Sequence, residues 1–304
     1  MLTAVVGINW GDEGKGRMVD LLSADYHTVV RYQGGNNAGH TVVNERGKFI
    51  LNLLPSGILR AGTVNVMGPG MVIDLEHLTH EIASLREKGI EVTPENLVIS
   101  DRATICMPYH KMLDILEERR LADKKFGSTQ RGIAPVYSDK YMKKTLRMGD
   151  LAHPEEMKAH LADLLEWKNL IINGAYGHEP VALEDMCAWL DTYGTPFLPF
   201  IKNTTSYLGK VAAEGGQIMF EAQLGALRDI DFGIFPYTSS SSTIAAYAPI
   251  GAGIPAHRLD KVIGIMKAYS SCVGEGPFTC ELFGKEAEAL REAGGEYGAA
   301  TGRP

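Results

Sequence analysis

Short apolar runs alternate with longer amphipathic stretches along this chain, and this pattern predicts strands alternating with helices. Runs rich in Val, Ile and Leu predict buried strands at residues 4–8, 27–32, 64–67, 97–100, 217–221 and 261–269. Apolar residues at helical spacing predict helices at residues 17–22, 75–88 and 285–293. Two extended segments, 40–43 and 48–54, flank a polar turn and predict a hairpin.

The middle of the chain has a different pattern, in which helical spacing predominates. Residues 108–122 and 154–214 are expected to be mostly helical, with breaks near 174–180 and 194–199. We therefore predict the α/β class: a central, mostly parallel sheet with helices on both faces, and a helical insertion. The predicted divisions are 1–100 for the first part of the α/β core, 101–214 for the insertion and 215–304 for the return to the core.

A glycine-rich loop, GDEGKG at residues 11–16, joins the first predicted strand to the first helix. Backbone amides at such a turn and at a helix N-terminus bind phosphate, and Lys15 adds a positive charge. The loop is not a standard P-loop, because Asn9 stands at its first glycine position and Gly16 replaces the hydroxyl that holds magnesium. A tight turn with solvated charges is the alternative, since Asp12 and Glu13 suit a phosphate site only where a metal or proton transfer needs a carboxylate.

Further polar loops carry candidate chemistry. Residues 33–41 contain amides that can recognise a base edge and His40, which can act as an acid, although a surface turn is the alternative. Residues 127–135 offer hydroxyls and amides to a monophosphate, or form a solvated loop. The serine-rich segment 237–243 is a possible substrate loop, and 298–304 ends in an arginine that can pair with a carboxylate or belongs to a disordered terminus.

Composition narrows the class of protein. The chain has 304 residues, 45% of them hydrophobic and 22% charged, as in globular proteins. A net charge of −7 without a long basic run argues against general nucleic-acid binding. The four cysteines form no CxxC pair, so we expect buried thiols in a reducing compartment. We find no secretory signal pattern and no apolar run of membrane-spanning length, so we expect no membrane partner and a cytoplasmic location.

Five motifs in this order resemble those of the adenylosuccinate synthetase family, along essentially the whole chain. They are WGDEGKG at 10–16, QGGNNAGHT at 33–41, STQRGIAP at 128–135, KAYS at 267–270 with VG at 273–274, and ATGR at 300–303. The resemblance implies a P-loop-NTPase-like fold and a ligase that uses GTP and Mg²⁺ to condense IMP with L-aspartate. Its products would be adenylosuccinate, GDP and phosphate, formed through 6-phosphoryl-IMP in the first committed step of AMP synthesis.

The resemblance also implies roles for individual residues. Asp12 matches the catalytic base and binds magnesium together with the carbonyl of Gly39, and His40 matches the acid that supports phosphoryl transfer. Lys15 would offset charge on the transferring phosphoryl group. The implied IMP contacts are Asp12, Glu13, Gly14, Lys15, Asn37, Ala38, Gly39, His40, Thr129, Lys143, Gln223, Ser239 and Arg303. The implied aspartate contacts are Val273, Ala299, Ala300, Thr301, Gly302 and Arg303. The implied GTP contacts are Gly11, Asp12, Glu13, Gly14, Lys15, Gly16, Arg17, Gly39, His40 and Thr41.

Several positions depart from the family pattern. Lys143 stands where an arginine usually reaches across a homodimer to the partner's IMP phosphate, and Ser239 and Ala300 stand where threonine is common. Gln223 is shifted by one place, because the usual EGAQG reads EAQLG here. Family members also continue past the TGR motif into a guanine-recognition segment. We therefore expect a truncated chain, and the sequence does not decide whether this chain is active by itself.

Three alternatives remain at this point. The chain could be a folded but inactive nucleotide-binding fragment that lacks the guanine site. It could be a phage-type relative that uses a guanine nucleotide in place of IMP, although Asp12 argues against this. An unrelated phosphate-loop kinase is disfavoured, because Lys15 is not followed by Ser or Thr.

Overall fold

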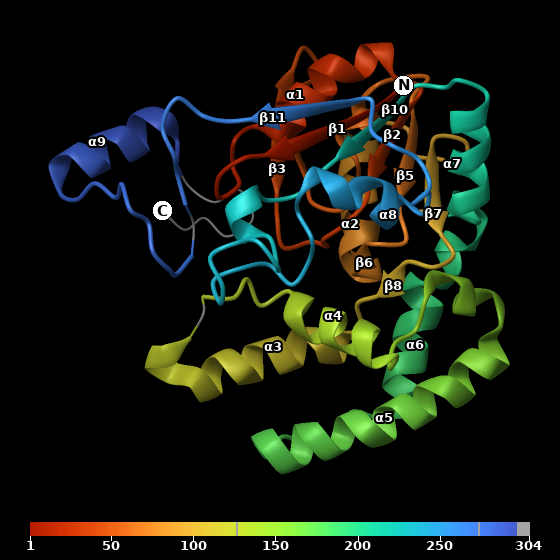
Figure 1. Ribbon diagram of the computed structural model, residues 1–304. Coiled ribbons are helices and arrows are strands. Elements are labelled where there is room, and N and C mark those ends of the chain that lie inside the picture. Colours follow the sequence, from red (N-terminus) through yellow and green to blue (C-terminus); the bar gives the residue numbers. More distant parts are fainter. Residues whose placement is uncertain (126, 273, 297–304) are drawn as a thin grey trace.

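A seven-stranded sheet forms the centre of the computed structural model, which describes residues 1–125, 127–272 and 274–296 (Figure 1). The strand order is β11-β1-β10-β2-β5-β7-β9, and every neighbouring pair in it is parallel. The strands are β1 (Leu2–Gly7), β2 (Thr28–Arg31), β5 (Val64–Met67), β7 (Leu97–Ser100), β9 (Ile201–Lys202), β10 (Ile218–Glu221) and β11 (Lys261–Ile265). The predicted α/β class with a central parallel sheet is therefore confirmed.

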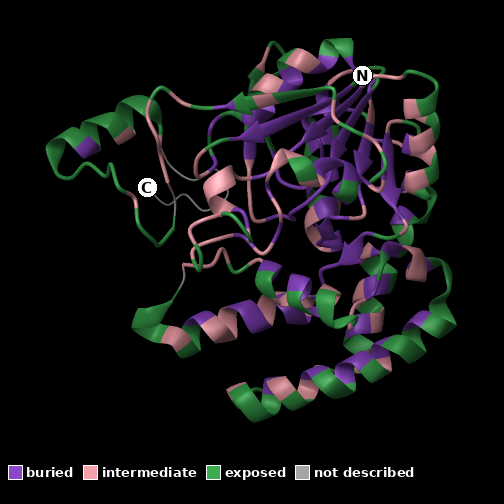
Figure 2. Cartoon of the chain, in the orientation of Figure 1, coloured by how far each residue is buried: buried purple, intermediate pink, exposed green. Residues whose placement is uncertain are grey.

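Helices cover both faces of this sheet. Neighbouring residues of a strand point to opposite faces, so Val29 and Val30 of β2 belong to different cores. Val29 lies in one cluster with Val19 of α1 (Lys15–Leu22), and Val30 lies in the other with Leu208 of α7 (Thr204–Ala213). The five inner strands are buried along most of their length (Figure 2), as their near-continuous apolar sequences predict, whereas the edge strands β9 and β11 are largely exposed or half-buried.

The predicted insertion is a group of helices that lies below the sheet in Figure 1. Its helices are α3 (Pro108–Leu121), α4 (Ile133–Met142), α5 (Pro154–Tyr176) and α6 (Leu183–Tyr193). One large apolar cluster joins α3, α5 and α6 to β7 and to α2 (Leu75–Glu87), whereas α4 packs in a separate cluster with Val72 and Cys106. The short strands β6 (Val72–Ile73) and β8 (Thr104–Ile105) lie between the two parts.

The remaining elements lie at the periphery or connect the others. The predicted hairpin is confirmed as β3 (His40–Asn44) and β4 (Gly47–Leu51). The remaining helices are α8 (Ala248–Ala252) and α9 (Lys285–Gly294). The 3-10 turns are η1 (Ser23–Asp25), η2 (Ser56–Leu59), η3 (Ala122–Lys124), η4 (Met148–Ala152), η5 (Thr195–Phe200), η6 (Ala226–Arg228) and η7 (Ala245–Tyr247).

The structure differs from the sequence-based predictions at several elements. The strand predicted at 261–269 ends at Ile265, because the polar residues that follow form a loop. The pattern singled out neither α4 nor β9, and β9 places two residues of the predicted insertion on the edge of the central sheet. The boundaries at 100 and 214 stay a prediction. Cys106 is buried as expected, whereas Cys280 is exposed and Cys187 and Cys272 are half-buried.

Loops at one edge of the sheet hold the polar motifs. Since parallel strands all end at the same edge, the loops that follow β1, β2 and β10 meet there. The loop at 127–132 approaches this edge from the insertion. Among the described residues, none of the helices combines the length and the apolar character needed to cross a membrane.

Candidate active site

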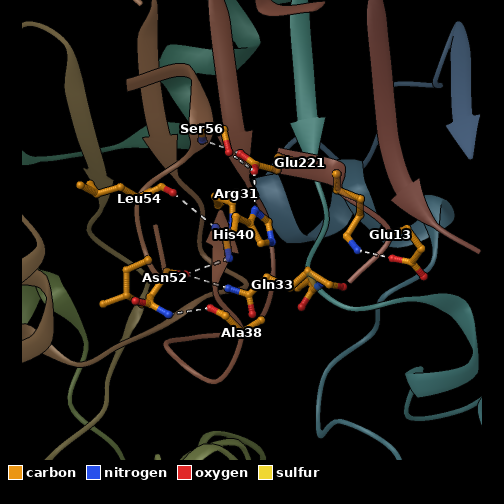
Figure 3. Close-up of polar contacts among 12 residues, drawn as sticks. Glu13, Arg31, Gln33, Ala38, His40, Asn52, Leu54, Ser56 and Glu221 are labelled. Atoms are coloured by element: carbon orange, nitrogen blue, oxygen red, sulfur yellow. Dashed lines mark hydrogen bonds and ion pairs between the residues drawn. The ribbon is translucent and has the colours of Figure 1, made fainter. Parts of the chain in front are cut away.

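The glycine-rich loop after β1 is held by the side chain of Glu13. Glu13 Oε1 accepts hydrogen bonds from the backbone N–H groups of Asn9 (3.1 Å) and Gly11 (2.9 Å). Its Oε2 forms a buried ion pair of 2.6 Å with Lys15 Nζ (Figure 3). The Glu13 carboxylate is therefore engaged within the loop, so a ligand contact predicted for Glu13 would have to come from its backbone. Asp12, at a φ of 58°, is an exposed residue, although the protein around it removes part of the water from its carboxylate.

Gly16 shows why this loop lacks the hydroxyl of a standard P-loop. A Cβ atom at Gly16 would lie 2.8 Å from the Cβ of His40, closer than real side chains approach. Any Ser or Thr at this position would push the second polar loop away. The glycine thus allows the start of α1 to pack directly against the start of β3.

His40 is oriented by a buried carboxylate that the sequence analysis did not identify. Its Nδ1 lies 2.7 Å from Oε1 of Glu221, at the end of β10. Glu221 also accepts hydrogen bonds from the backbone N–H (2.7 Å) and the hydroxyl (2.6 Å) of Ser56, as Figure 3 shows. His40 Nε2 is buried without a partner among the described residues. Because Glu221 accepts the proton at Nδ1, Nε2 is the nitrogen left for a ligand.

The electrostatics of this cluster favour a charged carboxylate beside a neutral imidazole. Burial and the positive charge of Arg31 lower the pKa of His40, and Glu221 opposes this shift. Burial works against ionisation of Glu221, but His40, Arg31 and Ser56 together lower its pKa. Arg31 is fully buried, and its guanidinium donates to the backbone carbonyls of Leu54 (3.3 Å) and Asn52 (3.1 Å). An anionic ligand at Nε2 would add negative charge and so favour the imidazolium.

A recess of about 180 Å³ brings the predicted phosphoryl-transfer residues together. Its lining residues are Asp12, Gly14, Lys15, Gly16, Ala38, Gly39, His40, Thr41, Leu224, Lys267 and Gly295. Burial by the surrounding protein raises the pKa of Asp12, and the charges of Lys15, Lys267 and His40 oppose the rise. A carboxylate with a raised pKa is a better proton acceptor than an ordinary aspartate, which suits a general base.

A second, larger cavity of about 650 Å³ adjoins this recess. Three predicted IMP contacts from distant parts of the chain, Asn37, Thr129 and Ser239, line it together. Arg228 also lines it and donates to the carbonyl of Tyr237. The sequence analysis did not identify Arg228.

Other predicted residues lie elsewhere. Arg17 is exposed on α1, and Lys143 is exposed at the end of α4, where it adopts a φ of 63°. Gly11 packs against Leu224 and is buried. The predictions for Val273, Ala299, Ala300, Thr301, Gly302 and Arg303 fall outside the described residues.

Gln223 requires a correction. Its side chain is fully buried beneath the 33–39 loop, where Nε2 donates to the carbonyl of Gly35 at 2.6 Å. A Cβ at Gly34 would lie only 2.2 Å from Gln223 Oε1, so the amide fills the space under this loop. The next residue, Leu224, faces the recess and the cavity instead. The one-place shift in the motif therefore puts leucine, not glutamine, at the site.

Two further buried carboxylates support the loops around the site. Glu81 accepts hydrogen bonds from the backbone N–H groups of residues 52–54, the segment whose carbonyls accept from Arg31. Asp229 accepts hydrogen bonds from the backbone N–H groups of residues on both sides of the serine-rich segment, including Asp231 and Ile244. Burial opposes ionisation of Asp229, but these backbone donors lower its pKa. The only sequence signal for such residues is an isolated acid within or beside an apolar run.

The donor set in the recess fits a magnesium ion that also binds phosphate. Mg²⁺ commonly takes one or two protein oxygens and completes its shell with phosphate oxygens and water. Asp12 and Gly39 line one recess with Lys15. Within the described part of the chain there is no group of three or more His, Cys, Asp or Glu residues that could form an all-protein metal site.

Comparison with known proteins gives a consistent result. The sequence profile described as adenylosuccinate synthetase matches residues 4–304. Adenylosuccinate synthetase 2 of Pseudoalteromonas translucida is 45% identical over 302 residues, which cover 99% of this chain and 71% of that protein. Adenylosuccinate synthetase of Clostridium acetobutylicum is 44% identical over 299 residues, covering 98% of this chain and 70% of the relative.

Solved structures agree with these relatives. The fully ligated adenylosuccinate synthetase of Plasmodium falciparum superposes with a TM-score of 0.91 at 34% identity, covering 99% of this chain and 70% of that one. A cyanophage succinoaminodeoxyadenylate synthetase, bound to dGMP and dATP, has a TM-score of 0.60 at 20% identity, which shows a shared fold only. It covers 87% of this chain and 63% of the phage chain. Motifs, fold and relatives thus lead to one conclusion: this chain belongs to the adenylosuccinate synthetase family.

Proposed function

We propose that this chain is a GTP-dependent ligase that condenses IMP with L-aspartate to form adenylosuccinate, GDP and phosphate. The observation that carries this proposal is the adjacency of two sites. Asp12, Lys15 and His40 line the smaller recess, and the polar side chains of Asn37 and Thr129 line the adjoining cavity. A phosphoryl donor in the recess would then lie next to an acceptor nucleotide in the cavity.

Asp12 prepares the acceptor in the first step. It removes the proton from N1 of the hypoxanthine, which raises the nucleophilicity of O6. The raised pKa of Asp12 suits this transfer. O6 then attacks the γ-phosphorus of GTP, the bond from that phosphorus to the bridging oxygen breaks, and GDP leaves.

His40 and Lys15 act on the charge of the transferring group. The Nε2 atom of a protonated His40 donates a hydrogen bond to a phosphoryl oxygen, while Glu221 accepts from Nδ1 and stabilises the imidazolium. Lys15, fixed by its 2.6 Å contact with Glu13, stabilises negative charge on the phosphoryl oxygens. In the second step the aspartate amine displaces phosphate at C6. The residues proposed to bind aspartate, with Arg303 among them, belong to the part of the chain outside the described residues.

Asp12 and the carbonyl of Gly39 would hold Mg²⁺ in the recess they line. The ion would supply positive charge to the phosphate oxygens of GTP.

We further propose that the protein works as a homodimer in the cytoplasm, where its three substrates occur. Exposed apolar side chains at the end of α4 and on α5 support a protein interface there: Tyr141 is 75%, Met142 47% and Leu170 65% exposed. Lys143 lies beside them. The family resemblance implies that the cationic side chain at this position contacts the IMP phosphate bound by the partner subunit.

A coupled assay tests the proposed function. The purified chain is mixed with GTP, IMP, L-aspartate and Mg²⁺, and adenylosuccinate is followed by its ultraviolet absorbance while released phosphate is measured in parallel. We expect both products to appear together and to depend on all three substrates. Phosphate release that is indifferent to IMP and aspartate, without adenylosuccinate, would contradict the proposal.

A further inference from the structure

Arg228 lies between two loops of the site. It ends the 3-10 turn η6, which follows the loop after β10. The backbone N–H of the neighbouring Leu227 donates to the carbonyl of Asn9 at 3.0 Å, just before the glycine-rich loop. The carbonyl of Arg228 itself accepts from the backbone N–H of Ser239 at 2.8 Å. The backbone thus fixes this arginine between the loop that carries Asp12 and the serine-rich segment.

The charged side chains on the walls of the larger cavity are mostly acidic. These acidic residues are Asp114, Glu117, Glu118, Asp139 and Glu275. Among the described residues that line the cavity, the basic ones are Lys168 and Arg228. Lys168 Nζ forms a buried ion pair of 2.5 Å with Asp139. An anionic substrate that enters this cavity therefore meets repulsion from carboxylates, and Arg228 is the lining cation placed to offset it.

Two neutral groups orient the guanidinium of Arg228. Its Nη1 donates to the backbone carbonyl of Tyr237, and its Nη2 donates to the thiol sulfur of Cys272 at 2.8 Å. Burial raises the pKa of this thiol, and Arg228 opposes the rise without cancelling it, so the sulfur is uncharged at neutral pH. These two contacts therefore hold the guanidinium in place without neutralising its charge.

The surroundings of Arg228 place it near the reacting end of the site. Besides burial, the negative charge of Asp12 raises the pKa of Cys272, so this thiol lies within electrostatic range of the proposed base. In the second step the aspartate amine must reach C6 of the hypoxanthine, which brings the aspartate carboxylates to the same end. The 5′-phosphate of IMP is attached at the other end of the nucleotide. Since a guanidinium forms two parallel hydrogen bonds to a carboxylate, the position and chemistry of Arg228 suit aspartate.

We propose that Arg228 binds a carboxylate of L-aspartate in the larger cavity. This inference rests on the proposed function. It adds a described residue to an aspartate site whose other proposed members lie outside the described residues. Arg228 acts by binding and orienting the substrate that carries the amine, and it takes no part in proton or phosphoryl transfer.

Direct binding of L-aspartate tests this role. Aspartate is titrated by calorimetry into IMP-saturated protein: the unmodified chain, Arg228→Gln, Arg228→Lys and the control Arg258→Gln, an exposed change outside both cavities. We expect the affinity for aspartate to fall about tenfold or more in Arg228→Gln, because a charged hydrogen bond is lost. Arg228→Lys should lose less, because it keeps the charge but not the planar fork, and Arg258→Gln should match the unmodified chain. Equal affinity in Arg228→Gln and the unmodified chain would overturn the inference.

Two further readouts separate this inference from misfolding and from failure of the proposed function. In steady-state kinetics, Arg228→Gln should raise the KM for aspartate about tenfold or more and change the KM for IMP and for GTP by less than about twofold. A rise confined to IMP would assign Arg228 to the nucleotide phosphate and overturn the inference. Unchanged calorimetric binding of IMP to Arg228→Gln shows that the cavity is intact. An unmodified chain that binds aspartate through Arg228 but forms no adenylosuccinate contradicts only the proposed function, and one that binds no aspartate contradicts the inference.

Discussion

At the scale of single residues, two adjacent carboxylates in the same loop have different tasks because their surroundings differ. Glu13 is buried, paired with Lys15 and bonded to two backbone N–H groups, which fixes the loop. Asp12 faces the recess, and burial by the surrounding protein raises its pKa. The sequence presents these acids as a pair, whereas the structure shows that Glu13 braces the loop and that Asp12 faces the recess, as the proposed base must.

Replacement of Asp12 by asparagine should remove the base with little change in shape. We expect turnover to fall by about 10²–10⁴-fold, while the affinity for IMP changes little. Initial rates and nucleotide binding measured by calorimetry check this, with Asp25→Asn, an exposed change near the end of α1, as the control. Normal turnover in Asp12→Asn would remove Asp12 from the role of base. Since the base must be ionised, activity in the unmodified protein should rise with pH through a pKa higher than that of an ordinary aspartate.

Replacement of Glu221 by glutamine should separate orientation from binding at His40. The amide keeps the size of the side chain but cannot stabilise an imidazolium, and it can offer an N–H where Nδ1–H now donates. We expect the turnover of Glu221→Gln to fall about tenfold or more, with a smaller change in KM. The turnover of His40→Asn should fall further. If Glu221→Gln and His40→Asn were combined, the losses should not add, because both act through one imidazole. Additive losses would show that Glu221 acts independently of His40.

At the scale of secondary structure elements, one buried carboxylate joins three helices of the insertion. Asp139 on α4 lies 2.9 Å from His110 Nε2 on α3 and 2.5 Å from Lys168 Nζ on α5. The backbone N–H of Met107 donates to His110 Nδ1 at 2.9 Å, so Nε2 carries the proton that Asp139 accepts. These helices carry the Thr129 and Lys143 regions, so the ion pair supports the geometry of the cavity.

Removal of one partner of this ion pair should destabilise the protein. Lys168→Met leaves Asp139 buried without its positive partner, and we expect a loss of about 3–5 kcal/mol in the free energy of unfolding. Lys158→Met, an exposed change on the same helix, should change it by less than about 0.5 kcal/mol. Denaturant unfolding measures both. The double variant Asp139→Asn with Lys168→Met should recover part of the loss, because no unpaired charge remains. Equal stability of Lys168→Met and Lys158→Met would mean that the ion pair contributes nothing.

The sequence predicts elements well where local signals determine them. The β1–loop–α1 unit, the β3–β4 hairpin and α2 lie within about three residues of their predicted positions, since apolar period and turn residues are local signals. The two-residue strand β9 depends on pairing with β7, and no local pattern could show it. The same holds for Glu221, whose task depends on the approach of β3 to β10 in space.

Gln223 shows the limit of motif matching in the site. The motif contains a glutamine, and the one-place shift moves that side chain from the cavity to the space under the 33–39 loop. Adjacent residues in a tight loop point in different directions, so a shift of one place exchanges a buried side chain for one that lines the site. The residue types were visible in the sequence, but their directions were not.

At the scale of the whole molecule, the site is assembled from both structural parts. The ends of β1, β2 and β10 supply the recess, and the insertion supplies Thr129 and much of the larger cavity. Lys143 lies on the insertion beside exposed Tyr141 and Met142. It lines neither the recess nor the larger cavity of its own chain. A second copy docked on this face could receive Lys143 in its own cavity, as an isologous dimer requires.

Subunit mixing tests this arrangement in the intact protein. Asp12→Asn and Lys143→Ala are each expected to have low activity alone, the second because the IMP phosphate loses a cation. In a mixed dimer, one site contains Asp12 from one chain and Lys143 from the other, so equal mixing should restore activity to about a quarter of the unmodified level. Light scattering confirms that Lys143→Ala remains dimeric, and mixing each variant with itself is the control. If Lys143 served its own chain, neither site of the mixed dimer would be complete, and activity would stay at the average of the two variants.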